Sequence, residues 1–132
     1  MALRYRITKR NNSIQNNKEQ YIMQAVHKGV VGLEEISQHI SNMSSISETD
    51  VLAVLHALGW QLERNLEKGY IVDLDYIGRF KMGFKGKAAN NPEDLNVKKH
   101  IQSFHVNYQP STKMKRKLKK GIPTYKEGTP KG

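Results

Sequence analysis

Hydrophobic and polar residues alternate near the N-terminus, and this pattern predicts β-strands. Residues 3–8 alternate strictly, and residues 21–26 are rich in strand-forming side chains. Residues 10–18 between them are polar and rich in Asn, which is typical of a loop. The first 30 residues are therefore expected to contain two strands joined by a loop.

The next part of the chain has the spacing of amphipathic helices. Apolar side chains recur every three or four residues after Leu33, which predicts a helix over residues 33–42. A second, longer helix is expected to begin at Ser47, whose hydroxyl can accept a hydrogen bond from the Asp50 amide, and to end before Gly69.

Beyond the second helix the apolar residues return to a spacing of two. This spacing predicts strands over residues 70–76, 79–85 and 100–108, with a loop over residues 85–96. In the middle strand aromatic and Met side chains alternate with Arg and Lys, so that one face is apolar and the other basic. The last strand changes phase near residues 102–103.

The C-terminal part is strongly basic and ends in turn-forming residues. Residues 113–120 are expected to form a short basic helix or tail, in which Met114 and Leu118, four residues apart, are the apolar anchors. Residues 121–132 contain Gly, Pro, Thr and Lys and are expected to be a flexible tail.

Charge is segregated along the chain, which favours a polyanion as the partner. The chain carries a formal net charge of +10, of which residues 1–32 contribute +5, residues 33–78 contribute −6 and residues 79–132 contribute +11. Basic flanks around an acidic middle indicate a face or set of arms built for a polyanion. The plainer alternative is a solvated basic surface with a disordered tail.

Several function classes are disfavoured by what the sequence does not contain. Cysteine is absent, which excludes disulfides and cysteine-ligated metals and agrees with a reducing compartment. No apolar run approaches the roughly 18 residues of a membrane span. The five histidines share no metal-ligand spacing, and no nucleophile or phosphate loop accompanies the acids. We therefore expect no enzyme, cofactor, metal, small-molecule substrate or membrane partner.

Four segments together resemble the bacterial histone-like HU/IHF family. Residues 47–55 resemble the start of its second helix, and residues 67–74 resemble its step from Lys-Gly into a strand. Residues 77–80 occupy the place of the family's Gly-x-Phe turn, and residues 106–111 resemble the Phe-x-Pro stretch before its last helix. The order and spacing of these segments are most similar to divergent, N-terminally extended histone-like proteins.

This resemblance implies an α+β fold that works as an intertwined homodimer. It implies a helix pair, an antiparallel β-sheet with a long β-hairpin arm, and a short C-terminal helix, as in IHF. Residues 1–32 would be a β extension packed on the main domain, residues 33–120 the HU/IHF-like DNA-binding domain and residues 121–132 the flexible tail. A close approach by a partner helix would explain Gly59 within the second helix.

The partner that the resemblance implies is double-stranded DNA, bound at the nucleoid in the cytoplasm without sequence reading. The family's arm carries an Arg-Asn-Pro tip that wedges between base pairs; here the arginine is missing, and Glu93 and Asp94 follow the proline. Two carboxylates beside phosphates would weaken binding there. The candidate DNA contacts are Arg79, Lys81, Lys85 and Lys87, then Lys98, Lys99, Lys113, Lys115, Arg116 and Lys117, with Asn91 and Pro92 at the tip.

Two other functions remain open on the sequence. An RNA-binding protein fits the basic tail, and a preference for structured RNA over duplex DNA would favour it. A structural assembly module that keeps the HU fold but has lost DNA binding fits the acidic tip and the N-terminal extension, and self-association without nucleic-acid binding would favour it.

Overall fold

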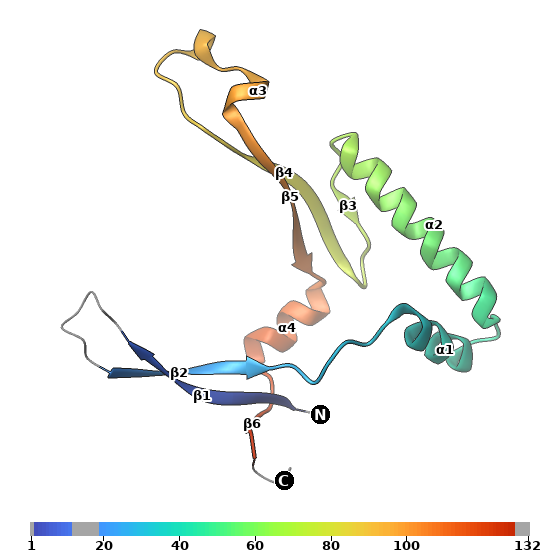
Figure 1. Cartoon of the computed structure of the whole chain (residues 1–132). Coiled ribbons are helices and arrows are strands. Elements are labelled where there is room, and N and C mark those ends of the chain that lie inside the picture. Colours follow the sequence, from blue (N-terminus) through green and yellow to red (C-terminus); the bar gives the residue numbers. More distant parts are fainter. Residues whose placement is uncertain (1, 12–18, 129–132) are drawn as a thin grey trace. The chain divides into compact units, whose positions relative to one another are not determined.

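The chain is described by a computed structural model over residues 2–11 and 19–128 (Figure 1). Its described residues form two compact units. One combines residues up to Val31 with those from Lys117 onward, and the other comprises residues Gly32–Arg116. Helices and small sheets occur together, so the predicted α+β class is confirmed.

The first unit contains a three-stranded sheet. Its strands are β1 (Leu3–Asn11), β2 (Glu19–Val26) and β6 (Thr124–Lys126), in the order β2-β1-β6. β1 and β2 pair antiparallel along their full length, which confirms the two predicted strands. The predicted loop is wrong for its first two residues, which extend β1, and residues 12–18 lie outside the described residues.

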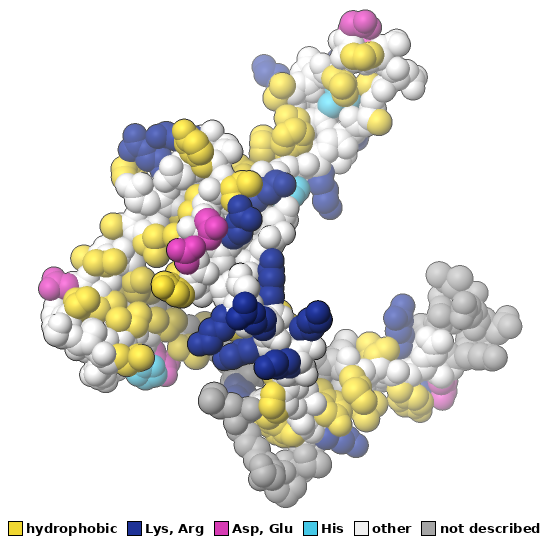
Figure 2. Space-filling view, turned by 180° about the vertical axis from the view of Figure 1, so that it is seen from behind, with side chains coloured by type: hydrophobic (Ala, Val, Ile, Leu, Met, Phe, Trp, Pro, Cys, Tyr) yellow, Lys and Arg dark blue, Asp and Glu magenta, His cyan; other side chains and the backbone are white. Residues whose placement is uncertain are grey.

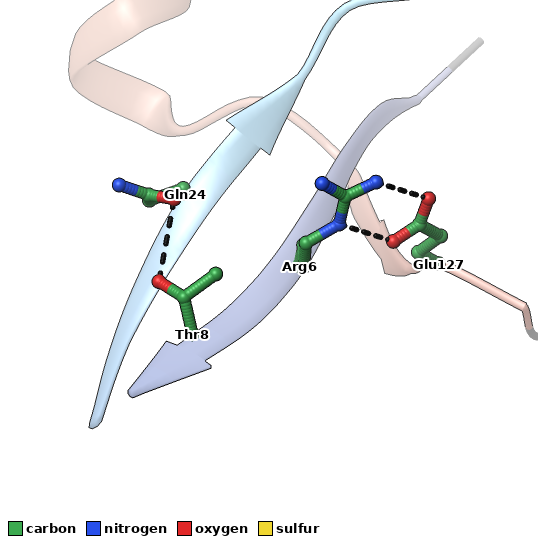
Figure 3. A network of polar contacts seen from close by, with 4 residues as sticks. All are labelled: Arg6, Thr8, Gln24 and Glu127. Carbon is green, nitrogen blue, oxygen red and sulfur yellow. Dashed lines mark hydrogen bonds and ion pairs between the residues drawn. The ribbon is translucent and has the colours of Figure 1, made fainter. Parts of the chain in front are cut away.

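The third strand of this sheet was not predicted from the sequence. The expectation of a flexible segment after Gly121 is wrong for β6, which pairs in parallel with the start of β1. A bidentate ion pair fastens it, because Arg6 Nε and Nη2 donate to Glu127 Oε2 and Oε1 at 2.6 and 2.8 Å (Figure 3). On the other side of β1, Thr8 Oγ1 donates to Gln24 Oε1 at 3.3 Å.

The second unit begins with two packed helices. They are α1 (Leu33–Met43) and α2 (Glu48–Glu67), which agree closely with the predicted spans. The Ser47 hydroxyl accepts from the Asp50 amide at 3.2 Å, which satisfies one of the free N–H groups at the start of α2. Among the described residues, only two hydrophobic side chains are buried: Val51 and Leu66, both on α2.

A second three-stranded sheet follows, in the order β3-β4-β5. Its strands are β3 (Val72–Asp73), β4 (Gly78–Gly86) and β5 (Ile101–Pro110), and β4 and β5 form a long antiparallel hairpin. The prediction of a strand over residues 70–76 is largely wrong, because only two residues pair. A turn follows, in which the Asp73 carboxylate accepts from the amide of residue 75 at 3.0 Å.

Gly78 is the residue that lets this turn lie against β5. Its φ of +144° is in the region that favours glycine, and an added Cβ would lie 2.3 Å from the Gln109 carbonyl oxygen. The Tyr108 hydroxyl donates to the Ile77 carbonyl at 2.8 Å and closes the same corner. The sequence resemblance at residues 77–80 therefore corresponds to a sterically required glycine.

The outer end of the β4–β5 hairpin contains short helical turns. The predicted loop over residues 85–96 is interrupted by a 3₁₀ turn, η1 (Pro92–Asp94), and is followed by α3 (Val97–His100). The backbone N–H of Lys87 donates to the His100 carbonyl at 2.7 Å. This hydrogen bond joins the two sides of the hairpin where its outer end begins. The pairing register shifts between residues 85 and 86 of β4, which lie opposite residues 101–103 of β5, where the sequence predicted a change of phase.

The last helix is α4 (Thr112–Lys120), which confirms the predicted basic helix. Ser111 lies just before it, nearly buried, and its hydroxyl accepts from the Met114 amide at 3.2 Å. This bond satisfies one of the free N–H groups in the first turn of α4.

Candidate nucleic-acid interface

The pairing register divides the β4–β5 hairpin into an apolar face and a basic, polar face. Across the two strands, aromatic, Met and Val side chains oppose one another: Phe80 with Tyr108, Met82 with Val106 and Phe84 with Phe104. The alternate pairs are Arg79 with Gln109, Lys81 with Asn107 and Lys85 with Ser103. Successive residues of a strand point to opposite faces, so the cations share one face and the apolar residues the other.

The cations of the basic face are exposed and differ in how far they are neutralised. Arg79 Nε lies 3.6 Å from Asp73 Oδ2, which is a loose ion pair. Among the described residues, no carboxylate forms an ion pair with Lys81 or Lys85. Two positive charges on this face are therefore available to an external anion.

A shallow depression of about 250 Å³ lies on this face at the base of the hairpin. It is lined by Arg79 and Lys81 of β4, by Asn107 and Gln109 of β5 and by Ile71. The two amide side chains can donate to and accept from a polar ligand beside the two cations. Sequence reasoning did not select these two residues, although the alternation of β5 places them opposite its apolar side chains.

The remaining predicted residues of the hairpin lie near its outer end. Lys87 follows β4, and Lys98 and Lys99 belong to α3; all three are exposed. Lys87 lies two residues beyond Lys85, and α3 is close to it across the hairpin, because the Lys87 amide donates to the His100 carbonyl at the end of α3.

The predicted wedge at the tip is part of a folded turn. Pro92 is the first residue of η1, and the Asn91 side-chain amide lies 3.5 Å from the Asp94 carboxylate. Figure 2 shows hydrophobic side chains over the outer part of the hairpin and an acidic side chain at its end. This end is therefore more apolar and more acidic than a tip made for phosphates.

α4 concentrates positive charge most strongly. Lys113, Lys115, Arg116 and Lys117, all predicted, are exposed, and Lys119 and Lys120 continue the series (Figure 2). The chain carries no acid between Asp94 and Glu127, so this helix repels other cations and attracts anions.

Other kinds of site find no support in the described residues. No group of three or more His, Asp or Glu side chains within them could hold a metal ion. No helix in the same part of the chain is long and apolar enough to cross a membrane.

A helix pair, a sheet with a long two-faced hairpin and a basic final helix are the elements of an HU-type protein. A family model described as "HU domain fused to wHTH, Ig, or Glycine-rich motif" matches residues 1–125. The chain therefore belongs to the HU-HIG family. The match includes residues 1–32, which the sequence predicted to be an extension outside the HU-like domain.

The fold also has a counterpart among solved structures. A crystal structure from Bacteroides vulgatus, described as that of a presumed bacterial DNA-binding protein, matches with a TM-score of 0.64 and 13% sequence identity. The match covers 98% of this chain and 51% of that chain, so this chain spans about half the length of its counterpart. At this identity the likeness shows a shared fold. No curated protein matches the chain in sequence.

Proposed function

We propose that this chain is a non-enzymatic DNA-binding protein of the nucleoid, which contacts phosphates with little regard to sequence. The observation that carries the proposal is the register of the β4–β5 hairpin, which puts Arg79, Lys81 and Lys85 on one face. The family's HU domain and the presumed DNA-binding role of the similar solved protein support it.

The interaction would be mainly electrostatic. Neutralising phosphates with Lys and Arg releases condensed counterions, so the affinity falls steeply as salt rises. No element of the described residues resembles a recognition helix for the major groove. The most basic helix, α4, carries mostly Lys, which neutralises phosphates as a point charge. The partner would be a duplex of any sequence.

We further propose that two copies form an HU-type dimer through the second unit. Leu52, Leu55, Leu58 and Leu62 of α2 are only partly buried within one chain. Met82, Val106 and Tyr108 of the hairpin's apolar face are 36%, 51% and 52% exposed. Apolar surface on this scale on so small a unit favours a covering partner. Nothing lies within 4 Å of a Cβ built on Gly59, so space for a partner helix remains there.

The first experiment is a titration of a fluorescent random-sequence duplex at about 50 and about 200 mM salt, where several phosphate contacts cost orders of magnitude in affinity. The variant replaces Arg79, Lys81, Lys85 and Lys87 by Ala. We expect its affinity to fall by at least about 100-fold at the lower salt, and its dependence on salt to become shallower.

The control separates local contacts from total charge. Arg64→Gln/Lys68→Gln removes two cations from the end of α2, and Lys81→Gln/Lys85→Gln removes two from the hairpin. DNA binding should suffer much more from the hairpin pair. Equal losses would show that net charge alone drives binding, and no binding by the wild-type chain at low salt would overturn the proposal.

A second candidate function, an assembly module, is favoured by the outer end of the hairpin. An apolar pocket of about 250 Å³ lies there, lined mainly by Phe84, Leu95, Val97, His100 and Ile101. Leu95 and Val97 are 55% and 72% exposed, beside the acids of η1. Leu95→Ser/Val97→Ser should leave duplex binding intact if this end contacts protein, and should weaken duplex binding if it contacts DNA.

A further inference from the structure

β2 forms an open edge of the N-terminal sheet. In the order β2-β1-β6 it pairs with β1 along its length, and no described residue pairs with its other side. This edge is eight residues long and presents a row of backbone N–H and C=O groups. Such a row is a template for another extended strand.

The edge lacks the features that usually keep edge strands apart. Residues 21–26 contain no charged side chain, no Pro and no Gly. The one charge in β2 is Glu19 at its beginning, and Lys9 of β1 neutralises it with an Nζ–Oε1 distance of 2.7 Å. Nothing in this strand repels a second uncharged strand.

One face of the same edge exposes large apolar side chains. Tyr21 and Met23 are 66% and 70% exposed, and they lie across from Lys9 and Ile7 of β1. An added strand would place new neighbours beside them, and such cross-strand contacts are the main stabilising unit of a sheet.

We propose that β2 pairs antiparallel with β2 of a second copy of this chain, joining two three-stranded sheets into one of six strands. An uncharged strand is complementary to itself across a two-fold axis, which is the geometry of a self-complementary dimer interface. β2 contains no Lys or Arg, so a nucleic acid does not fit this edge. This contact between β2 strands is separate from the DNA-binding function and from the dimer proposed above. If both contacts form, the β2 contact would link HU-type dimers into longer assemblies.

The pairing can be trapped by cysteines, because the natural chain has none. Single substitutions Tyr21→Cys, Ile22→Cys, Met23→Cys, Gln24→Cys and Ala25→Cys are made in the full chain and oxidised mildly. Residues opposite one another in antiparallel strands have Cα atoms about 4.5–5.5 Å apart, which suits a disulfide. We expect cross-linking between copies to peak at one position or at two adjacent positions.

Thr124→Cys, on the opposite edge of the same sheet, is the matched control. Thermal unfolding of each variant confirms that its fold is intact. A sharp peak within residues 21–25 above the Thr124→Cys level supports the proposal. No position above that level would overturn it.

Sedimentation of nuclease-treated protein gives an independent measurement. Gln24→Lys should weaken the association through β2 by roughly 10-fold, since like charges on paired strands repel one another. Thr124→Lys adds the same charge at the control edge, β6. Added salt should strengthen this association, because each copy carries +10. No DNA is present, so DNA binding can fail without affecting the result. Equal association of the two variants would overturn the pairing.

Discussion

The two long hairpins of this chain each begin with a strand that contains alternating cations and apolar residues, but they use these charges differently. β1–β2 and β4–β5 are both antiparallel, and β1 and β4 each alternate cations with apolar residues. In β1, Arg6 and Lys9 form ion pairs with carboxylates at 2.6 and 2.7 Å. In β4, Lys81 and Lys85 have no such partner among the described residues.

This difference shows that a basic strand is not by itself an interface. The carboxylates of Glu19 and Glu127 neutralise cations of the first hairpin and help to fix its neighbouring strands. The second hairpin leaves its lysines solvated, and solvated lysines can exchange counterions for phosphates. Ion pairs within the described residues therefore involve two of the four cations of β1, but in β4 only Arg79, and that one loosely.

The largest expected effect is on DNA affinity. Lys81→Gln/Lys85→Gln should reduce duplex binding at about 50 mM salt by roughly 100-fold, because each lost phosphate contact removes close to 0.9 from the salt slope. Arg6→Gln/Lys9→Gln removes the same charge from paired cations and should cost much less. The measurement is a duplex titration at several salt concentrations. Equal losses from the two hairpins would remove the distinction between them.

A second comparison concerns two glycines with the same φ angle. Gly29, after β2, and Gly78, before β4, both have a φ of +144°. A Cβ at Gly29 would meet nothing within 4 Å, whereas at Gly78 it would meet the neighbouring strand. Gly29→Ala should cost about 1–3 kcal/mol of backbone strain, and Gly78→Ala about 1–3 kcal/mol more from overpacking.

Urea denaturation followed by circular dichroism and by tyrosine fluorescence would measure both effects. If the two variants lose the same stability, the close contact at Gly78 is relieved by a small movement of β5. The Tyr108 hydroxyl, which donates to the Ile77 carbonyl, would then shift as well.

Much of this arrangement could be predicted from local sequence patterns. Both helices, β1, β2 and α4 follow from periodicity and caps, and the two faces of the β4–β5 hairpin follow from alternation. β6 could not be predicted, because three residues carry no periodic pattern and their partner strand, β1, is more than a hundred residues away along the chain. The strand expected over residues 70–76 is only two residues long in the structure, because the Asp73 side chain caps a tight turn.

The candidate site was predicted only in part, for a related reason. Alternation identifies Lys81 and Lys85, but Asn107 and Gln109 become site residues only through the pairing register of β5. The turn at Pro92 interrupts the loop expected over residues 85–96, and α3 follows it. Neither could be predicted, because contacts such as that of the Lys87 amide with the His100 carbonyl depend on tertiary structure.

A smaller effect is expected from the loose ion pair at the start of β4. Asp73→Asn should free Arg79 and strengthen duplex binding by up to about 5-fold, the range of an exposed pair. Asp75→Asn removes the same charge two residues away and is the matched control. Binding by the two variants at low salt would be compared in one titration. An equal gain would mean that Asp73 acts only through its charge, and that its pairing with Arg79 has no effect.

The smallest expected effect concerns the ion pair that fastens β6. Hydrogen bonds from Arg6 lower the pKa of Glu127 from its ordinary value of 4.5. A carboxyl with a lowered pKa stabilises the folded chain above its ordinary pKa, and that contribution is lost as the pH falls through the lowered value. Protection of the Glu127 amide, which donates to the Tyr5 carbonyl at 2.8 Å, should therefore decrease in acid.

Amide hydrogen exchange, corrected for its intrinsic pH dependence, would measure this loss. Glu127→Gln should show the lower protection at every pH, because its side chain cannot ionise. The pair is largely solvated, with side chains 53% and 36% exposed, so the change should be small and confined to β6 and the start of β1. If wild type and variant agree across the pH range, backbone pairing alone holds β6. The Arg6–Glu127 pair would then contribute nothing to the structure of this sheet, and the contrast with the second hairpin would rest on the Lys9–Glu19 pair alone.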